Sequence, residues 1–600
     1  MVSTLEPDAA DVPVIDGVLL AVLSKRLEGI VRKMHNTLLR TARSGVINNG
    51  RDFSCCIVTG DAELLTLGES LPIHLMVGSD MMAQSMKDLH PQLRRGDAFI
   101  HNSPYHGCSH AADQSILVPV IDDQGVHRFT AIAKAHQADI GNAMPTTYMF
   151  SAKDVYEEGA LIFPSVKVQE DYQDIEDIIR MCMLRIRVPD QWRGDYLAAL
   201  GAARIAEREL LALGDELGWE VLHAYQREWF NYSEQRMVGA LRKLPSGRTR
   251  ACSTHDPFPG TPPDGIPVTL AVEMDAEAGS IEVDLRDNMD CLPSGLNLSE
   301  ACARTAAMIG IFNSIEPGVP PNAGSFRRIC VHLRENCVVG IPRHPASCSI
   351  ATTNVADRVT NAVQRAIAEF AEGYGMAETG AVQSPAGAVI SGFDPRNDNR
   401  AFVNQLQLGD TLGAAGPSED GWLTLFGAGS AGQCLWDSVE VDETLYPIRV
   451  TERRIVTDSE GAGKYCGAPS SFVEFSPVAC SLRVIYVTDG TINAPLGTRG
   501  GLTGTSARTL MRKASGKDTP IPPYGDLTLT AEESIIGISC GGAGYGDPRT
   551  RDPVRVQRDV AEGYVTAERA RETYCVVLDK TGTVDHKKTQ QLRAQTVGRR

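Results

Sequence analysis

Histidines crowd into one short stretch of the 600-residue sequence. Six of the thirteen histidines lie between residues 90 and 136, far more than an even distribution would place there. Imidazole nitrogens bind divalent metals and transfer protons near neutral pH. The crowding therefore indicates a chemical site in this stretch.

Two of these histidines each precede an aspartate by three residues. The segment GCSHAAD contains His110 and Asp113, and AKAHQAD contains His136 and Asp139. This spacing brings two side chains to one side of a helical turn. One imidazole and one carboxylate from each of two elements suit Zn, Mn or Fe better than Ca. The alternative is that the aspartate caps a helix and the histidine is a hydrogen-bonded core residue. The crowding of histidines in this stretch favours the metal site.

A nucleophilic alternative lies in the same stretch. Cys108 is two residues from both His106 and His110, so a Cys–His couple is conceivable. Adjacency in sequence does not establish the hydrogen-bond geometry that such a couple needs. Metal chemistry is therefore the first interpretation, and His106 is kept as a candidate catalytic residue.

The elements that must position these residues are predicted from periodicity and turn composition. Amphipathic helices are expected at 16–43, 195–217, 216–243, 356–373 and 555–573. Short strands are expected at 55–59 and 97–102, with a strand, a tight turn and a strand over 267–287. We therefore predict a mixed α/β (α+β) fold with a helix-rich N-terminal part and a β-rich C-terminal part.

Composition divides the chain into several segments, as its length suggests. Residues 245–266 are rich in Pro, Gly, Ser and Thr and match neither regular period, so we expect a linker there. This linker separates a metal-site-bearing region, 14–244, from an α+β region, 267–578. Residues 1–13 and the tail, 579–600, are expected to be flexible.

Charge and cysteine usage exclude several classes of partner. The chain has 58 Lys and Arg against 75 Asp and Glu, a formal net charge of −17, which disfavours nucleic acid and anionic membranes. Its apolar runs are shorter than the ~18 residues that span a bilayer, and its start has no apolar signal segment. Fifteen cysteines without a CxxC pair are typical of reduced thiols. We expect a cytoplasmic protein that binds neither nucleic acid nor membrane.

Glycine-rich segments in the C-terminal part do not match nucleotide-binding loops. GAGSAG at 427–432 fits GxGxxG in form, but no helix is predicted directly after it. SCGGAGYGDP at 539–548 is typical of a glycine-dense turn, whose backbone could alternatively approach a ligand or another chain closely.

Several segments also match a known pattern in order along the chain. Residues 96–120, GDAFIHNSPYHGCSHAADQSILVPV, resemble GDxxxxNDPYxGGxHxxDxxxxxPV, and residues 541–578 resemble GGGGYGDPxxRDPxxVxxDVxxGxVSxxxAxxxYGVVL. RDFSCCI at 51–57, LPIHLM at 71–76 and AHQADIG at 135–141 are similar to RxDFSxAI, IPVHLG and HHADIGG. These patterns are those of the hydantoinase B/oxoprolinase family. The resemblance covers nearly the whole chain and implies a multi-domain hydantoinase B-like fold.

The resemblance implies a B-type subunit of an ATP-dependent enzyme. Such subunits work with an A-type ATPase of ASKHA fold, which binds ATP and Mg and phosphorylates the carbonyl oxygen of a cyclic amide or ketone. Hydantoinases, 5-oxoprolinases and lactamases then hydrolyse the activated amide. Acetone and acetophenone carboxylases instead join the activated enol to CO₂ from bicarbonate. A hetero-oligomer is implied, to which the carboxylase type would add a small third subunit.

The resemblance also implies a ligand set for a divalent metal, Zn or Mn. The ligands correspond to Asp52, His110, Asp113 and His136. Asp139 would orient a ligand or act as a general base, unless it only caps a turn. Ser103 and Cys108 depart from the family pattern, and this leaves the substrate open.

Three functions are therefore weighed. Hydrolysis of a hydantoin, lactam or oxoproline-like ring is favoured, because the length of the chain is nearer to that of the hydrolase type. The second is catalysis in an ATP-dependent ketone carboxylase. The third is a non-catalytic scaffold for the ATPase, which is disfavoured because buried carboxylates and imidazoles are costly without a metal.

Overall fold

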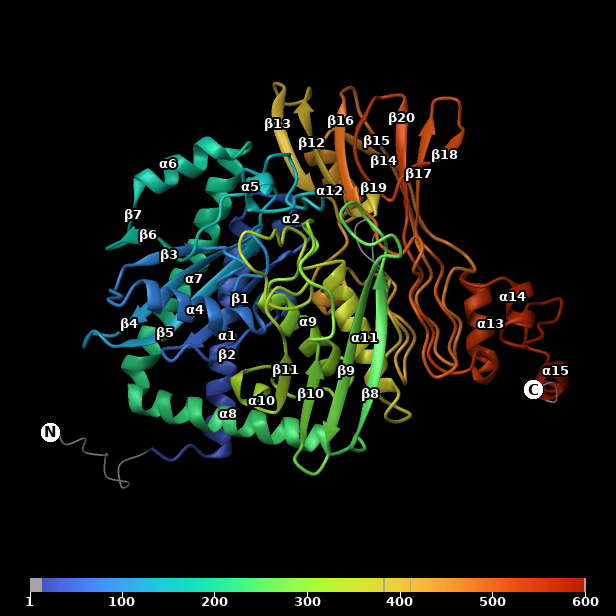
Figure 1. Cartoon of the computed structure of the whole chain (residues 1–600), viewed down its shortest axis with the longest axis horizontal. Helices are drawn as coiled ribbons and strands as arrows, with labels where there is room; N and C mark the ends of the chain where they lie inside the picture. The colour runs from blue at the N-terminus through green and yellow to red at the C-terminus, as the bar shows by residue number, and fades with distance from the viewer. Residues whose placement is uncertain (1–12, 381–383, 410–411, 598–600) are drawn as a thin grey trace.

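A seven-stranded antiparallel sheet carries the histidine-rich stretch (Figure 1). This computed structural model describes residues 13–380, 384–409 and 412–597. In the order β2-β1-β5-β4-β3-β6-β7, the strands span Leu64–Thr66, Phe53–Thr59, His127–His136, Asp113–Ile121, Ala98–His101, Val166–Glu170 and Gln173–Asp174. The strands predicted at 55–59 and 97–102 correspond to β1 and β3.

Helices cover both faces of this sheet. Alternate strand residues, such as Cys55 and Ile116, pack in one core cluster with α1 and α7, whereas their neighbours Cys56 and Leu117 pack in another with α4. Because both faces are buried, these strands read as continuous apolar runs. The helices of this part span α1 (Gly17–Thr41), α2 (Gly45–Asn48), α3 (Pro72–Leu75), α4 (Gly78–Leu89), α5 (Val155–Glu158), α6 (Glu176–Arg185), α7 (Pro189–Leu217) and α8 (Trp219–Leu241).

The predicted long helices are confirmed as α1, α7 and α8. Helix α1 begins after Asp16, whose carboxylate accepts the backbone N–H of Leu19 at 2.8 Å. Helix α7 begins earlier than predicted, at Pro189, a residue that suits the first turn of a helix. Gly218 separates α7 from α8 and has a φ of +85°, a conformation that glycine adopts readily.

A four-stranded sheet begins inside the segment that we predicted to be a linker. Its strands, in the order β11-β10-β9-β8, span Ile329–His332, Ser280–Asp284, Ile266–Asp275 and Gly247–His255. The linker prediction is therefore wrong for residues 247–255, because β8 pairs with β9 along its whole length. Strand β8 is polar because much of it is partly or fully exposed, and this hides the strand period. Whether a domain boundary lies there stays a prediction.

Helices α9, α10 and α11 accompany this second sheet. They span Glu300–Phe312, Ala323–Phe326 and Val355–Ala368. The predicted helix at 356–373 is confirmed as α11, which packs on α9 and on β8 and β9. Strands β9 and β10 confirm the predicted strand, turn and strand.

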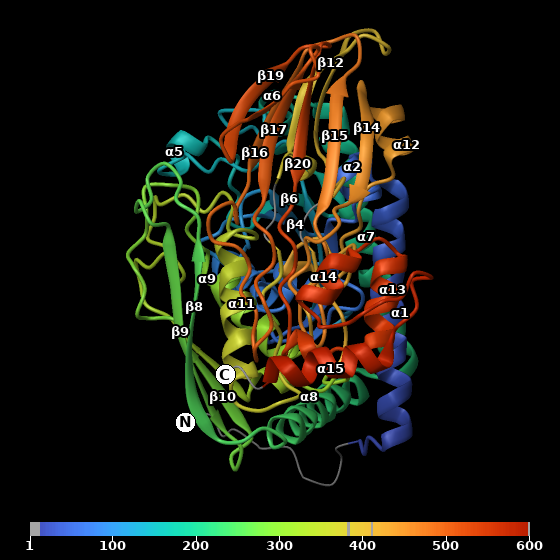
Figure 2. The same ribbon diagram turned by 90° about the vertical axis from the view of Figure 1, so that its right-hand side faces the viewer.

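The C-terminal part contains two further sheets that share a core. The first, in the order β13-β12-β16-β19, spans Arg400–Gln405, Val389–Asp394, Leu482–Val487 and Tyr524–Leu529. The second, in the order β14-β15-β20-β17-β18, spans Ile448–Ile455, Ser471–Pro477, Glu533–Ile538, Arg508–Lys513 and Asp518–Pro520. Helix α12 (Val439–Leu445) precedes β14. These sheets stand together at the top of the molecule (Figure 2) and confirm the predicted β-rich part.

Below these sheets, extended segments run side by side without forming regular strands (Figures 1 and 2). We call residues 413–421, 461–468, 497–505 and 541–544 the glycine-rich bundle. Backbone hydrogen bonds join its segments, among them those from Gly461 N to Gly542 O and from Gly544 N to Leu502 O. The turn predicted in SCGGAGYGDP is therefore wrong at residues 541–544, whose backbone approaches other segments of the same chain instead of turning.

The chain ends in three short helices beside the bundle. They are α13 (Pro553–Ala561), α14 (Ala567–Glu572) and α15 (His586–Val597). The single helix predicted at 555–573 is interrupted, since Gly563 has a φ of +77°. Helix α15 occupies most of the tail that we expected to be flexible, and all but the last of residues 1–13 lie outside the described residues. Within the described residues, no helix is both long and apolar enough to cross a membrane.

Candidate metal centre

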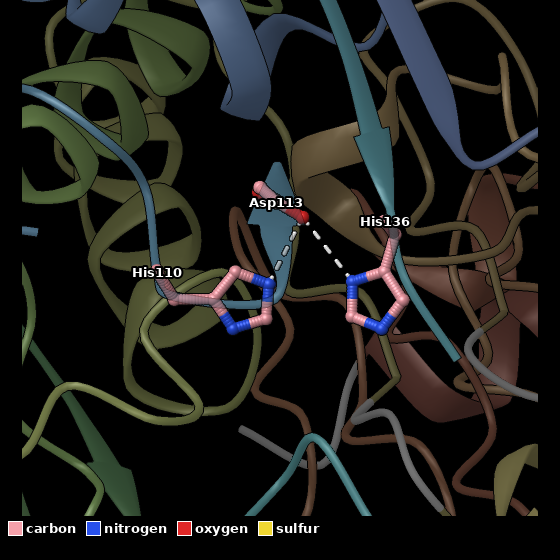
Figure 3. Close-up of side chains that lie close together, drawn as sticks. All are labelled: His110, Asp113 and His136. Carbon is pink, nitrogen blue, oxygen red and sulfur yellow. Dashed lines mark hydrogen bonds and ion pairs between the residues drawn. The ribbon is translucent and has the colours of Figure 1, made fainter. Parts of the chain in front are cut away.

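Three predicted ligands meet at one end of strands β4 and β5 (Figure 3). Asp113 is the first residue of β4, His136 is the last residue of β5, and the two are direct cross-strand partners. His110 lies in the turn before β4, which is closed by a hydrogen bond from Asp113 N to His110 O. One ligand atom from each of the three lies within 4.8 Å of the others.

The spacing of three residues acts differently at the two histidines. It places His110 beside Asp113 through a single turn at the start of a strand, not through a helix. The imidazole of His136 instead faces Asp113 across the hairpin. Asp139 points elsewhere, because its carboxylate binds the guanidinium of Arg187 at 2.8 Å. Both histidines therefore contact the same aspartate, Asp113, and Asp139 is not part of the group.

Asp113 lies between the two imidazoles (Figure 3). Its Oδ1 atom is 3.0 Å from Nε2 of His110 and 3.2 Å from Nδ1 of His136. Nδ1 of His110 donates to the carbonyl oxygen of Ser349 at 2.7 Å. Because a carbonyl can only accept, the neutral imidazole of His110 carries its lone pair on Nε2. A proton or a metal cation must therefore lie between that lone pair and the carboxylate.

The electrostatics of this group favour bound positive charge. Burial alone would raise the pKa of Asp113, but the imidazoles of His110 and His74 hold it well below its ordinary range. Burial likewise opposes a charged imidazole at His110, yet the carboxylate of Asp113 outweighs it and raises the pKa of His110. Asp113 is fully buried, so its negative charge requires compensation inside the protein.

The fourth predicted ligand, Asp52, lies next to this group but not within it. It immediately precedes β1, and its carbonyl oxygen accepts the backbone N–H of His136 at 3.0 Å. Its carboxylate oxygen Oδ1 is 3.3 Å from Nε2 of His74, and the same nitrogen is 3.5 Å from Oδ2 of Asp113. His74 therefore connects Asp52 to the other three residues.

Sequence reasoning missed a buried lysine that supports the group. Lys134 lies two residues before His136 on β5 and is fully buried. Its ammonium donates to Oγ of Ser109 at 3.0 Å and to the carbonyl oxygen of His74 at 2.7 Å. Ser109 in turn donates to Oδ2 of Asp113. The only signal in the sequence was a charged residue within the short apolar run AIAKA at 131–135.

The two predicted catalytic residues lie outside the three-residue group. Both carboxylate oxygens of Asp139 are held, one by the N–H of Gly141 and the guanidinium of Arg187, the other by the N–H of Arg187. These contacts match the turn-capping alternative. His106 is exposed and contacts Oγ of Ser103 at 2.8 Å. A catalytic role for Asp139 or His106 stays a prediction.

The structure gives the cysteine alternative little support. Cys108 is fully buried, and its thiol contacts the carbonyl oxygens of His110 and Asp113. Burial raises the pKa of this thiol, which disfavours the nucleophilic thiolate. Cys108 thus packs beneath the turn that carries His110.

The donor set fits a divalent transition metal. It offers two imidazoles and a carboxylate, with a further imidazole and carboxylate at His74 and Asp52. Mixed nitrogen and oxygen donors suit Zn or Mn, whereas Ca takes only oxygen.

Comparison with known proteins places the chain in a family. A family model described as hydantoinase B/oxoprolinase matches residues 16–548. The chain is 28% identical to the beta subunit of caprolactamase from Pseudomonas jessenii, over 97% of this chain and 99% of that protein. It is 26% identical to the B-type subunit of a putative D-/L-hydantoinase from Pseudomonas sp. (strain NS671), over 97% and 99% of the two chains.

A carboxylase subunit and a crystal structure are also similar. The chain is 24% identical to the acetophenone carboxylase delta subunit of Aromatoleum aromaticum, over 95% of this chain and 87% of that protein. The crystal structure of the ATP-dependent caprolactamase from Pseudomonas jessenii superposes with a TM-score of 0.85 at 26% identity, covering 97% of this chain and 100% of that one. The resemblance read from the sequence is thus confirmed, and the chain belongs to the hydantoinase B/oxoprolinase family, which includes subunits of ATP-dependent cyclic amide hydrolases and carboxylases.

Proposed function

We propose that this chain is the metal-binding catalytic subunit of an ATP-dependent enzyme that hydrolyses a cyclic amide. The substrate would be a hydantoin, a lactam or an oxoproline-like ring. An A-type ATPase subunit of ASKHA fold would bind ATP and Mg and phosphorylate the carbonyl oxygen of the ring. The observation that carries this proposal is the buried group of His110, Asp113 and His136.

The similarity to named relatives supports the hydrolase over the scaffold. The caprolactamase and hydantoinase subunits match over nearly their whole lengths, so the chain includes the parts that those subunits use. A scaffold would have no need of two imidazoles and a carboxylate buried together, since burying polar groups costs free energy unless they are paired. The four predicted ligands are all present and all buried.

Each side chain has a definite task in this proposal. A bound Zn or Mn ion would polarise an oxygen atom and favour its negatively charged form. His110 would hold the ion from the turn before β4 and His136 from the end of β5, with their second ring nitrogens fixed by Ser349 and Thr147. Asp113 supplies the charge that keeps the ion in place. Asp139 or His106 remains the predicted group that moves the proton.

Reconstitution with the A-type partner tests the reaction class. The complex is incubated with ATP and hydantoin, caprolactam or 5-oxoproline, with and without labelled bicarbonate. We expect ATP-dependent ring opening without incorporation of label. Label fixed into the product of a ketone substrate would show the carboxylase instead, the alternative that the acetophenone carboxylase relative represents.

A multiple variant tests the scaffold alternative. The variant replaces the four predicted ligands Asp52, His110, Asp113 and His136 with Asn, Gln, Asn and Gln. We expect it to retain the complex with the ATPase but to lose ring opening. Full activity in a folded quadruple variant would support the scaffold.

A further inference from the structure

His74 is a buried histidine that directly faces the proposed metal centre. It lies in α3 and is only 3% exposed. Its Nε2 atom faces carboxylate oxygens of both Asp52 and Asp113. We propose that His74 is a further protein donor to the same divalent ion, which joins Asp52 to the group of His110, Asp113 and His136. This inference rests on the proposed metal-binding function.

The distances around His74 are those of donors that share a cation. Nε2 is 3.3 Å from Asp52 Oδ1 and 3.5 Å from Asp113 Oδ2. A charge-assisted hydrogen bond would measure about 2.7–2.9 Å. Two donors that each bind one ion at about 2.1 Å lie roughly 3.0–3.4 Å apart at octahedral or tetrahedral angles. The distance from His74 to Asp52 and the contacts of Asp113 with His110 and His136 fall in this range, and the distance from His74 to Asp113 lies just above it.

The hydrogen bonds of His74 leave Nε2 free to serve as a donor to a metal. Nδ1 of His74 is 3.1 Å from Oγ of Ser54. Oγ of Ser54 also lies beside the carbonyl oxygen of Leu71, to which its own proton can point. With Nδ1–H donating to Ser54, the lone pair of Nε2 faces two carboxylate oxygens. In this tautomer, three electron-rich atoms face one another and repel unless a proton or a metal cation lies between them.

The net charge around His74 also favours a bound cation. Imidazoles that bind a metal ion are neutral, so the two carboxylates of Asp52 and Asp113 would then face one ammonium, that of Lys134, which reaches Asp113 through Ser109. One negative charge therefore stays uncompensated in a region with almost no solvent exposure. A bound cation offsets that negative charge, which would otherwise be costly in the interior.

Neighbouring strands hold His74 in position from two sides. Lys134 of β5 binds its carbonyl oxygen at 2.7 Å. Ser54 of β1 accepts the backbone N–H of Leu71, directly before α3, at 2.9 Å. Both strands also carry the ends from which Asp52 and His136 project. The imidazole is thus fixed by the same sheet that carries the other donors.

Cobalt binding by the purified full-length chain tests this inference. Co²⁺ takes the place of the proposed ion, and the visible absorption spectrum of the bound Co²⁺ reports which donors coordinate it. We compare the wild type with His74→Gln, which nearly keeps the side-chain volume, and with His74→Ala. His101→Gln is the matched control, since His101 is also fully buried but its imidazole contacts Ser165 and no carboxylate.

We expect one Co²⁺ per wild-type chain and per His101→Gln chain. His74→Gln and His74→Ala should bind Co²⁺ more than about 100-fold more weakly, beyond the 10- to 100-fold typical of a residue that only orients a ligand. Their Co²⁺ spectra, recorded at saturating metal, should also differ from the wild type.

Other outcomes separate this inference from the proposed function. If the wild type binds no transition metal, the proposed metal function fails. If the wild type binds Co²⁺ and the His74 variants keep its spectrum, His74 is not a donor, even where the affinity falls. Two Co²⁺ ions per wild-type chain would also overturn the inference of one shared ion.

Discussion

The candidate metal centre and the glycine-rich bundle depend on opposite features of the sequence. In the metal centre, the side chains of His110, Asp113 and His136 converge and their chemistry defines the site. In the bundle, backbones meet because side chains are missing: a Cβ on Gly542 would lie 2.0 Å from the carbonyl oxygen of Gly413, and one on Gly467 would lie 1.9 Å from that of Gly542. The proposed function therefore depends on side chains that the first region contains, whereas folding depends on the absence of side chains from the second.

The largest effect is expected from adding a side chain to the bundle. Gly542→Ala places its methyl group against a backbone carbonyl that cannot move aside without breaking neighbouring hydrogen bonds. We expect the variant to lose most of the ~5–15 kcal/mol of stability typical of a protein, so little folded protein should be recovered. Thermal unfolding and folded yield measure this.

Gly29→Ala in α1 is the control for the bundle variant, because a Cβ there meets nothing within 4 Å. It should be stabilised by up to ~1 kcal/mol, the difference in helix propensity. A normally stable Gly542→Ala protein would contradict the distinction between the two regions.

The next effect concerns function without loss of the fold. Asp113→Asn keeps the volume of the side chain but removes the charge that two imidazoles face. We expect metal affinity and ATP-dependent ring opening to fall by more than about 100-fold, while the variant remains folded. Metal analysis and thermal unfolding are measured on the same preparation.

Asp97→Asn serves as the comparison for Asp113→Asn. Asp97 is fully buried as well, but it pairs with Lys167 at 3.1 Å, away from the centre. Its substitution should leave the metal content unchanged. Equal metal loss in both variants would show that the effect is a general consequence of removing a buried charge.

A smaller effect is expected at the lysine behind the centre. Lys134→Met removes the hydrogen bonds to Ser109 and to the carbonyl of His74 while keeping an unbranched side chain of similar length. Because these bonds orient groups of the centre, metal affinity should fall about 10- to 100-fold. Metal titration measures this affinity. An unchanged affinity would show that Ser109 orients Asp113 without help from Lys134.

The smallest effect is a change in the pH dependence of stability. Asp442 of α12 forms a side-chain hydrogen bond with Asp437. Its carboxylate also accepts a hydrogen bond from the side-chain amide of Asn49. Burial and then the charge of Asp437 raise the pKa of Asp442 from 3.8 to about 9. The folded chain therefore keeps a proton that the unfolded chain releases above pH 4, and stability falls as the pH rises toward 9.

Asp442→Asn should remove much of that loss, since the amide needs no proton. The variant should therefore unfold at a higher temperature than the wild type at pH 9, with a smaller difference at pH 5. Unfolding curves at both values measure the change. A parallel pH dependence in the two proteins would assign the loss to other groups.

Residue type and spacing made part of the centre predictable. His110, Asp113 and His136 stand out as reactive side chains in a chain whose composition is otherwise ordinary. Asp52 was added by resemblance alone. His74 was not predicted as a ligand, since it is a lone histidine in an apolar segment with no partner at a regular spacing. Its proposed role depends on contacts with Asp52 and Asp113, which lie elsewhere in the sequence.

The fold likewise contains elements that could be predicted from the sequence and elements that could not. The long helices were predictable because α1 combines a cap with a regular apolar stripe. Strand β8 was not, because its exposed, polar residues hide the strand period. Residues 541–544 of the bundle were predicted to be part of a turn, because glycine permits both a turn and a close approach and only the partner segments decide between them.

The bond between His110 and the carbonyl of Ser349 spans 239 positions of sequence. During synthesis, all strands of the first sheet are available once Asp174 has emerged, but this bond must wait until Ser349 has emerged. Until then, nothing fixes the ring of His110 through its second nitrogen. If the chain binds the proposed metal ion, the nascent chain would hold that ion only weakly, and tight loading would require residues up to Ser349.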